Sequence, residues 1–68
     1  RAAFNLGVYA RKTLGLTQAQ LSALLGYHAK TRVSAIETGQ ARPGAAVCLL
    51  LQAYLDGYRP ALWPGRDA

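Results

Sequence analysis

The segment from residue 30 to residue 38 concentrates the side chains that are best suited to contact a charged, grooved partner. Its spacing predicts a helix whose outward face carries Lys30, Thr31, Ser34, Ala35 and Thr38. Small side chains on that face let a helix sit deep in a groove, while the cations Lys30 and Arg32 reach phosphates or the edges of guanine bases. These residue types favour double-stranded nucleic acid as the partner.

The net charge of +5 is unevenly distributed along the 68 residues. Residues 1–36 contain five basic residues and no Asp or Glu, whereas residues 37–68 contain three residues of each sign. A basic half suggests a polyanion, either nucleic acid or an anionic membrane surface. We expect no membrane partner, because no basic amphipathic segment stands apart from the predicted core. Lys30 and Arg32 as ordinary surface charges are the alternative, which the lack of acids before Glu37 disfavours.

Few residues are suited to catalysis or to metal binding. The three acids, His28 and Cys48 are scattered along the chain and form no acid–base pair or triad at a workable spacing. A single cysteine excludes an intrachain disulfide, and no cluster of Cys, His and acids predicts a metal site. We therefore expect no enzyme, no cofactor and no metal, with His28 solvated in a turn and Cys48 partly buried.

The chain is predicted to be all-α, because no stretch shows the alternation typical of a strand. A first helix is expected over residues 2–14, ending at Gly15, with its cap either Asn5 or a residue before position 1. The second helix is expected to open at Thr17, whose spacing to Gln20 is that of a capping box. Its buried stripe is Leu21, Leu24 and Leu25, and Gly26 ends it.

Two further helices complete the predicted core. The third begins at Lys30 or Thr31, of which Thr31 is the better capping residue, and it closes at Thr38-Gly39. Its inward side is expected to carry Ala29, Val33 and Ile36. The fourth covers residues 45–56, and its apolar face carries Val47, Leu50, Leu51, Tyr54 and Leu55.

Residues 58–68 form a tail with two prolines and the bulky pair Leu62 and Trp63. A single turn is expected around residues 61–63. Trp63 either covers the end of the core or, with Leu62, takes part in a dimer contact. We therefore divide the chain into a domain over residues 1–57 and a tail over residues 58–68.

Four motifs, in their order and spacing, resemble the lambda-repressor-like, Cro/C1-type helix-turn-helix family of bacterial and phage transcription regulators. They are Leu14-Gly15-Leu16-Thr17-Gln18, Leu21-x-x-Leu24-Leu25-Gly26, Val33-Ser34-x-Ile36-Glu37-x-Gly39 and Arg42-Pro43. The resemblance covers residues 6–56. It implies a compact all-α domain of four to five helices that binds double-stranded DNA.

The resemblance also implies roles for individual side chains. Those expected to touch bases are Lys30, Thr31, Arg32, Ser34 and Ala35. Those expected to touch phosphates are Thr17, Gln18, Thr38, Gln40 and Arg42. Arg11, which would otherwise be an ordinary solvated cation, is implied to form a structural ion pair with Glu37. From Gly26 to Glu37 the chain has one residue more than the family's usual turn, so His28 is an alternative to Lys30 as the first contact.

We accordingly expect a transcriptional regulator, a repressor, that acts as a homodimer on an inverted-repeat operator in the cytoplasm of a bacterial or phage-infected cell. Its two recognition helices would lie about 34 Å apart and read successive major grooves. The alternative is an antitoxin or accessory module that docks a protein partner such as a toxin through Leu62 and Trp63.

Overall fold

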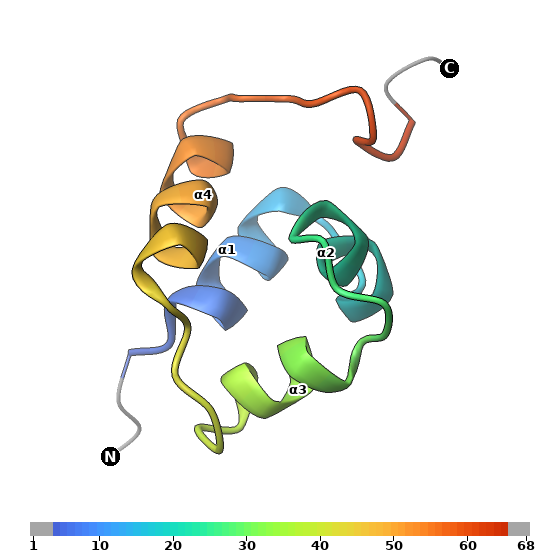
Figure 1. Cartoon of the computed structure of the whole chain (residues 1–68). Coiled ribbons are helices and arrows are strands. Elements are labelled where there is room, and N and C mark those ends of the chain that lie inside the picture. Colours follow the sequence, from blue (N-terminus) through green and yellow to red (C-terminus); the bar gives the residue numbers. More distant parts are fainter. Residues whose placement is uncertain (1–3, 66–68) are drawn as a thin grey trace.

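The computed structural model describes residues 4–65, which form four helices and no strand (Figure 1). The helices are α1 (Leu6–Leu14), α2 (Gln18–Leu24), α3 (Thr31–Glu37) and α4 (Ala45–Leu55). The all-α class is confirmed, with four helices. The described part of the tail forms turns, one of which is closed by a 3.0 Å hydrogen bond from the Trp63 amide to the Pro60 carbonyl. None of the helices in residues 4–65 is both long enough and apolar enough to cross a membrane.

Helix α1 is shorter than the predicted segment 2–14, of which residues 2 and 3 lie outside the described part. Asn5 has an extended backbone and is the N-cap, so the helix begins at Leu6. The Asn5 Oδ1 accepts a hydrogen bond from the Val8 amide at 3.0 Å. Gly15 ends the helix with a φ of +70°, a conformation that glycine adopts at low cost. The choice between the two possible caps is therefore settled in favour of Asn5.

The capping box at the start of α2 is confirmed. Thr17 Oγ1 accepts from the Gln20 amide at 3.1 Å, and Gln20 Oε1 accepts from the Thr17 amide at 2.9 Å. Leu21 and Leu24 are buried and Leu25 is partly buried, as the apolar stripe predicts. Local spacing was sufficient to predict the capping box because its two partners lie within one helical turn.

The start of α3 agrees with expectation in its position but not in its cap. Lys30, not Thr31, occupies the N-cap position, and it makes no side-chain capping hydrogen bond within the described residues. Thr31 is already the first helical residue, and Ala29 is exposed, not buried. The helix therefore begins at one of the two expected residues, whereas Thr31 as the cap and Ala29 as an inward residue were wrong. Burial of Val33 and Ile36 sets the position of the helix, and the turn before it places Lys30 at the cap.

Helix α4 supplies the centre of the core. Its Leu51 and Tyr54 are buried, and the Tyr54 hydroxyl donates a 2.9 Å hydrogen bond to the Leu24 carbonyl at the end of α2. The other buried members of the core cluster are Ala10, Leu16, Leu21, Leu24 and Val33. Cys48 is partly buried.

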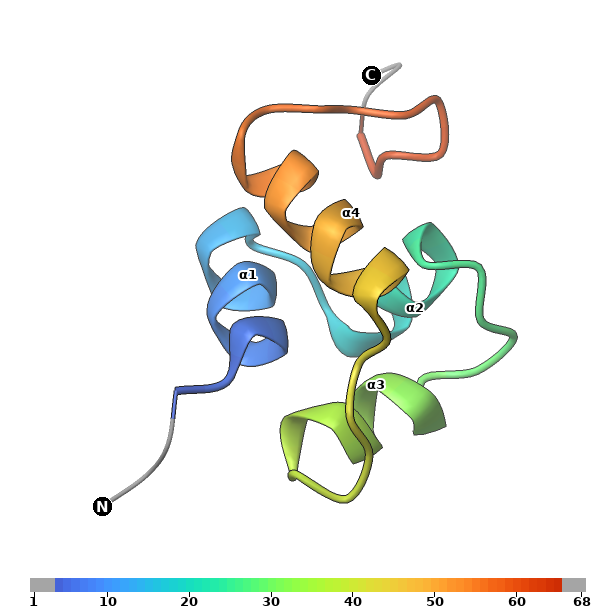
Figure 2. The same ribbon diagram turned by 60° about the vertical axis from the view of Figure 1, so that its left-hand side comes forward.

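The packing leaves α3 at one edge of the molecule. α1 packs against α4 and α3, and α2 packs against α3. In Figures 1 and 2, which differ by a rotation about the vertical axis, α3 is the lowest helix, and the other three helices lie above it. The outer side of α3 is thus left uncovered within the described residues.

Candidate nucleic-acid interface

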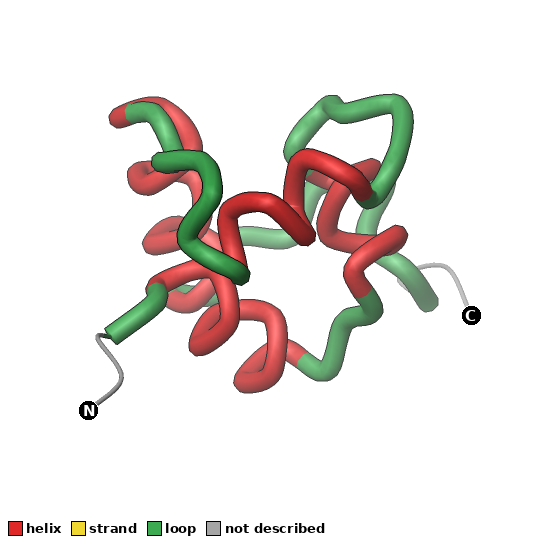
Figure 3. The backbone as a smooth tube through the Cα atoms, turned by 90° about the horizontal axis from the view of Figure 1, so that it is seen from below, coloured by secondary structure: helices red, strands yellow, loops and turns green. Residues whose placement is uncertain are grey.

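Helix α3 has an anchored side and an open side. Val33 and Ile36 are 2% and 5% exposed and hold the inner side against the core. At the start of the helix, Lys30, Thr31 and Arg32 are all exposed. Ser34 and Ala35 follow on the same helix and are partly buried. The view from below in Figure 3 faces this helix and the loops at its two ends.

The turn before α3 adds further exposed side chains. Residues 25–30 separate the last residue of α2 from the first residue of α3. His28 and Ala29, within that turn, are exposed. His28 and Lys30 are thus both exposed within three residues of the first residue of α3, and both are candidates for the first contact.

The loop after α3 is folded back onto the helix that it follows. The Ala35 carbonyl accepts hydrogen bonds from the amides of Gln40 at 2.9 Å and Ala41 at 3.1 Å. The Thr38 hydroxyl donates to the same carbonyl at 3.2 Å. Thr38, Gln40 and Arg42 are exposed. Of the three predicted phosphate contacts, Thr38 and Gln40 are thus bonded directly to α3, and Arg42 follows the bonded Ala41 in the chain.

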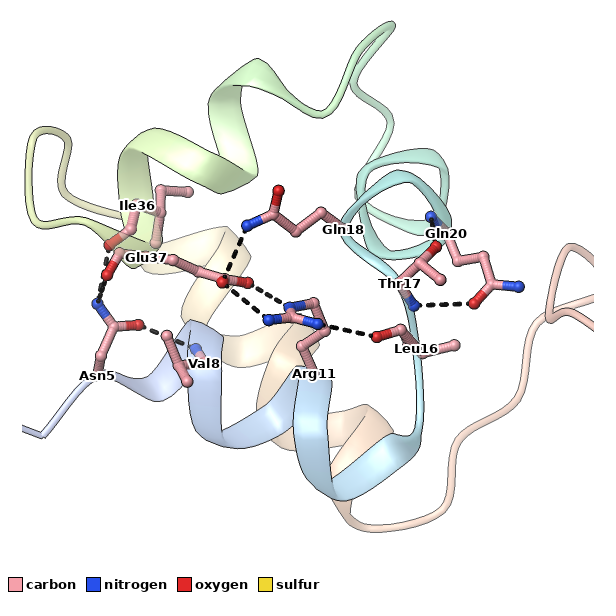
Figure 4. Close-up of polar contacts among 9 residues, drawn as sticks. All are labelled: Asn5, Val8, Arg11, Leu16, Thr17, Gln18, Gln20, Ile36 and Glu37. Carbon is pink, nitrogen blue, oxygen red and sulfur yellow. Dashed lines mark hydrogen bonds and ion pairs between the residues drawn. The ribbon is translucent and has the colours of Figure 1, made fainter.

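An ion-pair network joins α3 to α1 and α2 (Figure 4). Arg11 Nε donates to Glu37 Oε2 at 2.6 Å, and a second guanidinium nitrogen, Nη2, donates to Glu37 Oε1 at 3.1 Å. Gln18 Nε2 donates to Glu37 Oε1, also at 3.1 Å. Arg11 Nη1 donates to the Leu16 carbonyl at 3.2 Å. The Glu37 carboxylate near the end of α3 is therefore bound by side chains from both α1 and α2.

The electrostatics of this network keep Glu37 ionised. Burial of the Glu37 carboxyl raises its pKa, but hydrogen bonds from Arg11 and Gln18 and the charges of Arg11 and Lys12 outweigh it, so the pKa lies below its ordinary value. The hydrogen bond to Glu37 raises the pKa of Arg11. The Arg11 charge is consequently neutralised inside the fold, and Lys30, Arg32 and Arg42 are the exposed cations on α3 and its flanking loops.

Gln18 has a partner that its predicted role did not include. The resemblance implies that it contacts a phosphate, and in the structure its amide nitrogen is bonded to Glu37. Thr17, beside it, is exposed, while its hydroxyl oxygen accepts the capping bond. The start of α2 is therefore held close to the end of α3.

Asn5 belongs to the same region, although sequence reasoning considered it only as a cap of α1. Its Nδ2 donates to the Ile36 carbonyl at 2.8 Å and to the Glu37 carbonyl at 3.3 Å (Figure 4). No local signal relates residues 31 positions apart. The one available hint was chemical, since an asparagine amide both accepts and donates.

The two large tail residues differ in their surroundings. Trp63 is partly buried and packs against the core cluster, with its ring centroid 5.2 Å from that of Tyr54 in an edge-on geometry. The Arg59 guanidinium lies 4.1 Å from the centre of the Trp63 ring. Leu62, in contrast, is 72% exposed. Of the pair, Leu62 is the side chain that is available to a partner.

Comparison with known proteins agrees with this geometry. The family model described as helix-turn-helix matches residues 9–63, which include all four helices except the first turn of α1. No curated protein and no solved structure matches the chain. With most of its length covered by the match, the chain belongs to the Cro/C1-type helix-turn-helix family, whose domains are DNA-binding regulators.

Proposed function

We propose that this protein is a sequence-specific repressor that binds an inverted-repeat operator in double-stranded DNA as a homodimer. The observation that carries the proposal is the open side of α3: cationic and hydroxyl side chains are exposed at its start, while its inner side is locked into the core. A helix presented in this way can enter a major groove without disturbing the fold. A regulator of this kind would act in the cytoplasm of a bacterial or phage-infected cell.

The proposed contacts fall into two classes. Base edges are read by the start of α3 and the turn before it, through His28, Lys30, Thr31, Arg32, Ser34 and Ala35. Phosphates are held by the start of α2 and the loop after α3, through Thr17, Gln18, Thr38, Gln40 and Arg42. Phosphate contacts set the register and the salt dependence, whereas base contacts set the specificity.

The decisive experiment selects bound sequences from random duplex DNA at two salt concentrations. A palindromic consensus supports the proposal and gives the half-site spacing. Against that duplex, Lys30→Ala, Thr31→Ala and Arg32→Ala should each weaken binding without changing the melting temperature. Gln52→Ala, which changes an exposed side chain on α4, is the control. Unchanged affinity in all three α3 variants would refute the groove assignment.

The tail decides between a homodimer and a docking module. Deleting residues 58–68 would also remove Trp63 from the core, so a sharper variant is Leu62→Asp, which alters only an exposed side chain. If Leu62 lies in the dimer contact, the variant should sediment as a monomer and lose cooperative binding to the paired half-sites. The second candidate function, an antitoxin or accessory module, is favoured by the same exposure of Leu62. If this second function is correct, Leu62→Asp should keep full DNA binding and lose binding to the protein partner.

A further inference from the structure

The Asn5 side chain uses both ends of its amide, and each end serves a different helix. Oδ1 accepts from the Val8 amide at 3.0 Å and so caps the start of α1. Nδ2 donates to the carbonyls of Ile36 and Glu37, at 2.8 Å and 3.3 Å, and so caps the end of α3 (Figure 4). One side chain therefore fixes the first turn of α1 to the last turn of α3.

The end of α3 has few other groups that satisfy these carbonyls. The last carbonyls of any helix lack partners within it. The loop amides of Gln40 and Ala41 both turn to the Ala35 carbonyl, and the Gly39 amide reaches the Ile36 carbonyl only at 3.3 Å. The bond from Asn5 to the Ile36 carbonyl, at 2.8 Å, is shorter than the bond from the Gly39 amide.

Close packing leaves this amide little freedom to move. A methyl group added at Gly7 would lie 3.2 Å from Asn5 Oδ1 and 3.3 Å from the Ile36 side chain. α1 and α3 thus approach each other closely at this point, with the Asn5 amide between them. A hydrogen bond in such a site has a single geometry, so it transmits the position of α1 to α3.

The opposite end of α3 is not held in this way. The Lys30 side chain makes no capping hydrogen bond within residues 4–65, and residues 30–32, which are proposed to read bases, are exposed. A helix of seven residues is about 10 Å long, so a tilt of about 10° at its anchored end moves its start by about 2 Å. Since hydrogen bonds weaken within a few tenths of an ångström beyond about 3.2 Å, a shift of that size breaks base contacts.

We infer that Asn5 is a positioning residue for DNA recognition. The carboxylate of Glu37 gives the end of α3 one polar attachment to α1, through Arg11, and a single polar attachment restrains the angle of the helix less than two do. The bonds from Asn5 to the α3 backbone are a second attachment, six residues earlier on α1, and two attachments fix the angle of the helix. This inference rests on the proposed function and adds a residue that touches no DNA.

The test separates the two ends of the amide. Asn5→Asp and Asn5→Ser keep an oxygen that can accept from the Val8 amide, and both lose the amide NH₂ group that donates to Ile36 and Glu37. Tyr54→Phe is the control, since it removes a buried hydrogen bond between α4 and the Leu24 carbonyl of α2, a bond in which α3 takes no part. All proteins are compared by melting temperature and at a temperature where circular dichroism shows each to be folded.

The readout is a ratio of dissociation constants. One duplex carries the consensus that the wild-type protein selects from random DNA, and the other has the same length with both half-sites scrambled. For both Asn5 variants we expect the discrimination between duplexes to fall by about tenfold, a loss comparable with one base contact, and binding to the scrambled duplex to stay within about twofold. Tyr54→Phe should lower the melting temperature and leave the ratio unchanged.

Three outcomes would overturn the inference. The first is an unchanged ratio in both Asn5 variants. The second is an equal fall in Tyr54→Phe, which would assign the effect to stability alone. The third is a wild-type protein that selects no consensus, which would refute the proposed function itself and is recognised before any variant is made.

Discussion

Replacing Glu37 with alanine removes the group on which three hydrogen bonds converge. Two come from Arg11 and one from Gln18, so the change removes side-chain bonds from α3 to both α1 and α2 at once. It also leaves a guanidinium whose side chain is only 20% exposed without its counter-charge. We expect a markedly lower free energy of unfolding, because an unpaired charge in a partly buried site destabilises the folded state.

The magnitude follows from how buried the pair is. Removing one partner of a fully buried ion pair costs roughly 3–5 kcal/mol. The Glu37 side chain is 8% exposed, but Arg11 can recover some water and keeps its bond to the Leu16 carbonyl. We therefore expect a loss of about 2–3 kcal/mol, which for a domain of this size corresponds to about 10–20 °C in melting temperature.

Thermal and urea unfolding of the wild type, Glu37→Ala, Arg11→Met and the double variant measure this effect. The double variant should lose less stability than the sum of the two single losses, by about 1 kcal/mol or more, because it no longer contains an unpaired charge. A Glu37→Ala melting temperature within about 3 °C of the wild type would refute the reasoning, given the usual shift per kcal/mol. Additive losses in the cycle would show that the two side chains act independently.

Three further predictions concern the same core. Gly7→Ala should lower the free energy of unfolding by about 1 kcal/mol, although alanine has the higher helix propensity, because the new methyl group would crowd Asn5 and Ile36, which are both held in place. A variant that is more stable than the wild type in urea unfolding would contradict this. Ser22→Ala should raise the free energy of unfolding by about 1 kcal/mol, because the Ser22 hydroxyl is buried with no hydrogen-bond partner among the described residues. A clear loss of stability in urea unfolding would show that the hydroxyl has a partner. The folded-state pKa of Glu37 lies below its ordinary value of 4.5, so the stability that it contributes is present above that pH and is lost as the pH falls through the lowered pKa. The difference in unfolding free energy between wild type and Glu37→Gln should therefore shrink between about pH 5 and about pH 3, and a constant difference would count against the pair.

The sequence by itself determined the features whose partners lie within one or two helical turns. The capping box of Thr17 and Gln20, the stop at Gly15 and the buried stripe of α2 all depend on spacings of three or four residues. The basic first half and the small, cationic face of residues 30–38 are likewise visible in one dimension. The pairing of Arg11 with Glu37 came from the family resemblance, because nothing local connects positions 26 apart.

Tertiary structure alone decided the features that depend on packing. Local rules favoured Thr31 as the cap of α3, but the burial of Val33 and Ile36 fixed the helix start at that residue instead. The tail kept Trp63 against the core and left Leu62 exposed. The Asn5 side chain can bond α1 to α3 only because the absence of a side chain at Gly7 lets the two helices approach each other. Such contacts arise from distances between segments that are remote in sequence, and those distances exist only once the core has formed.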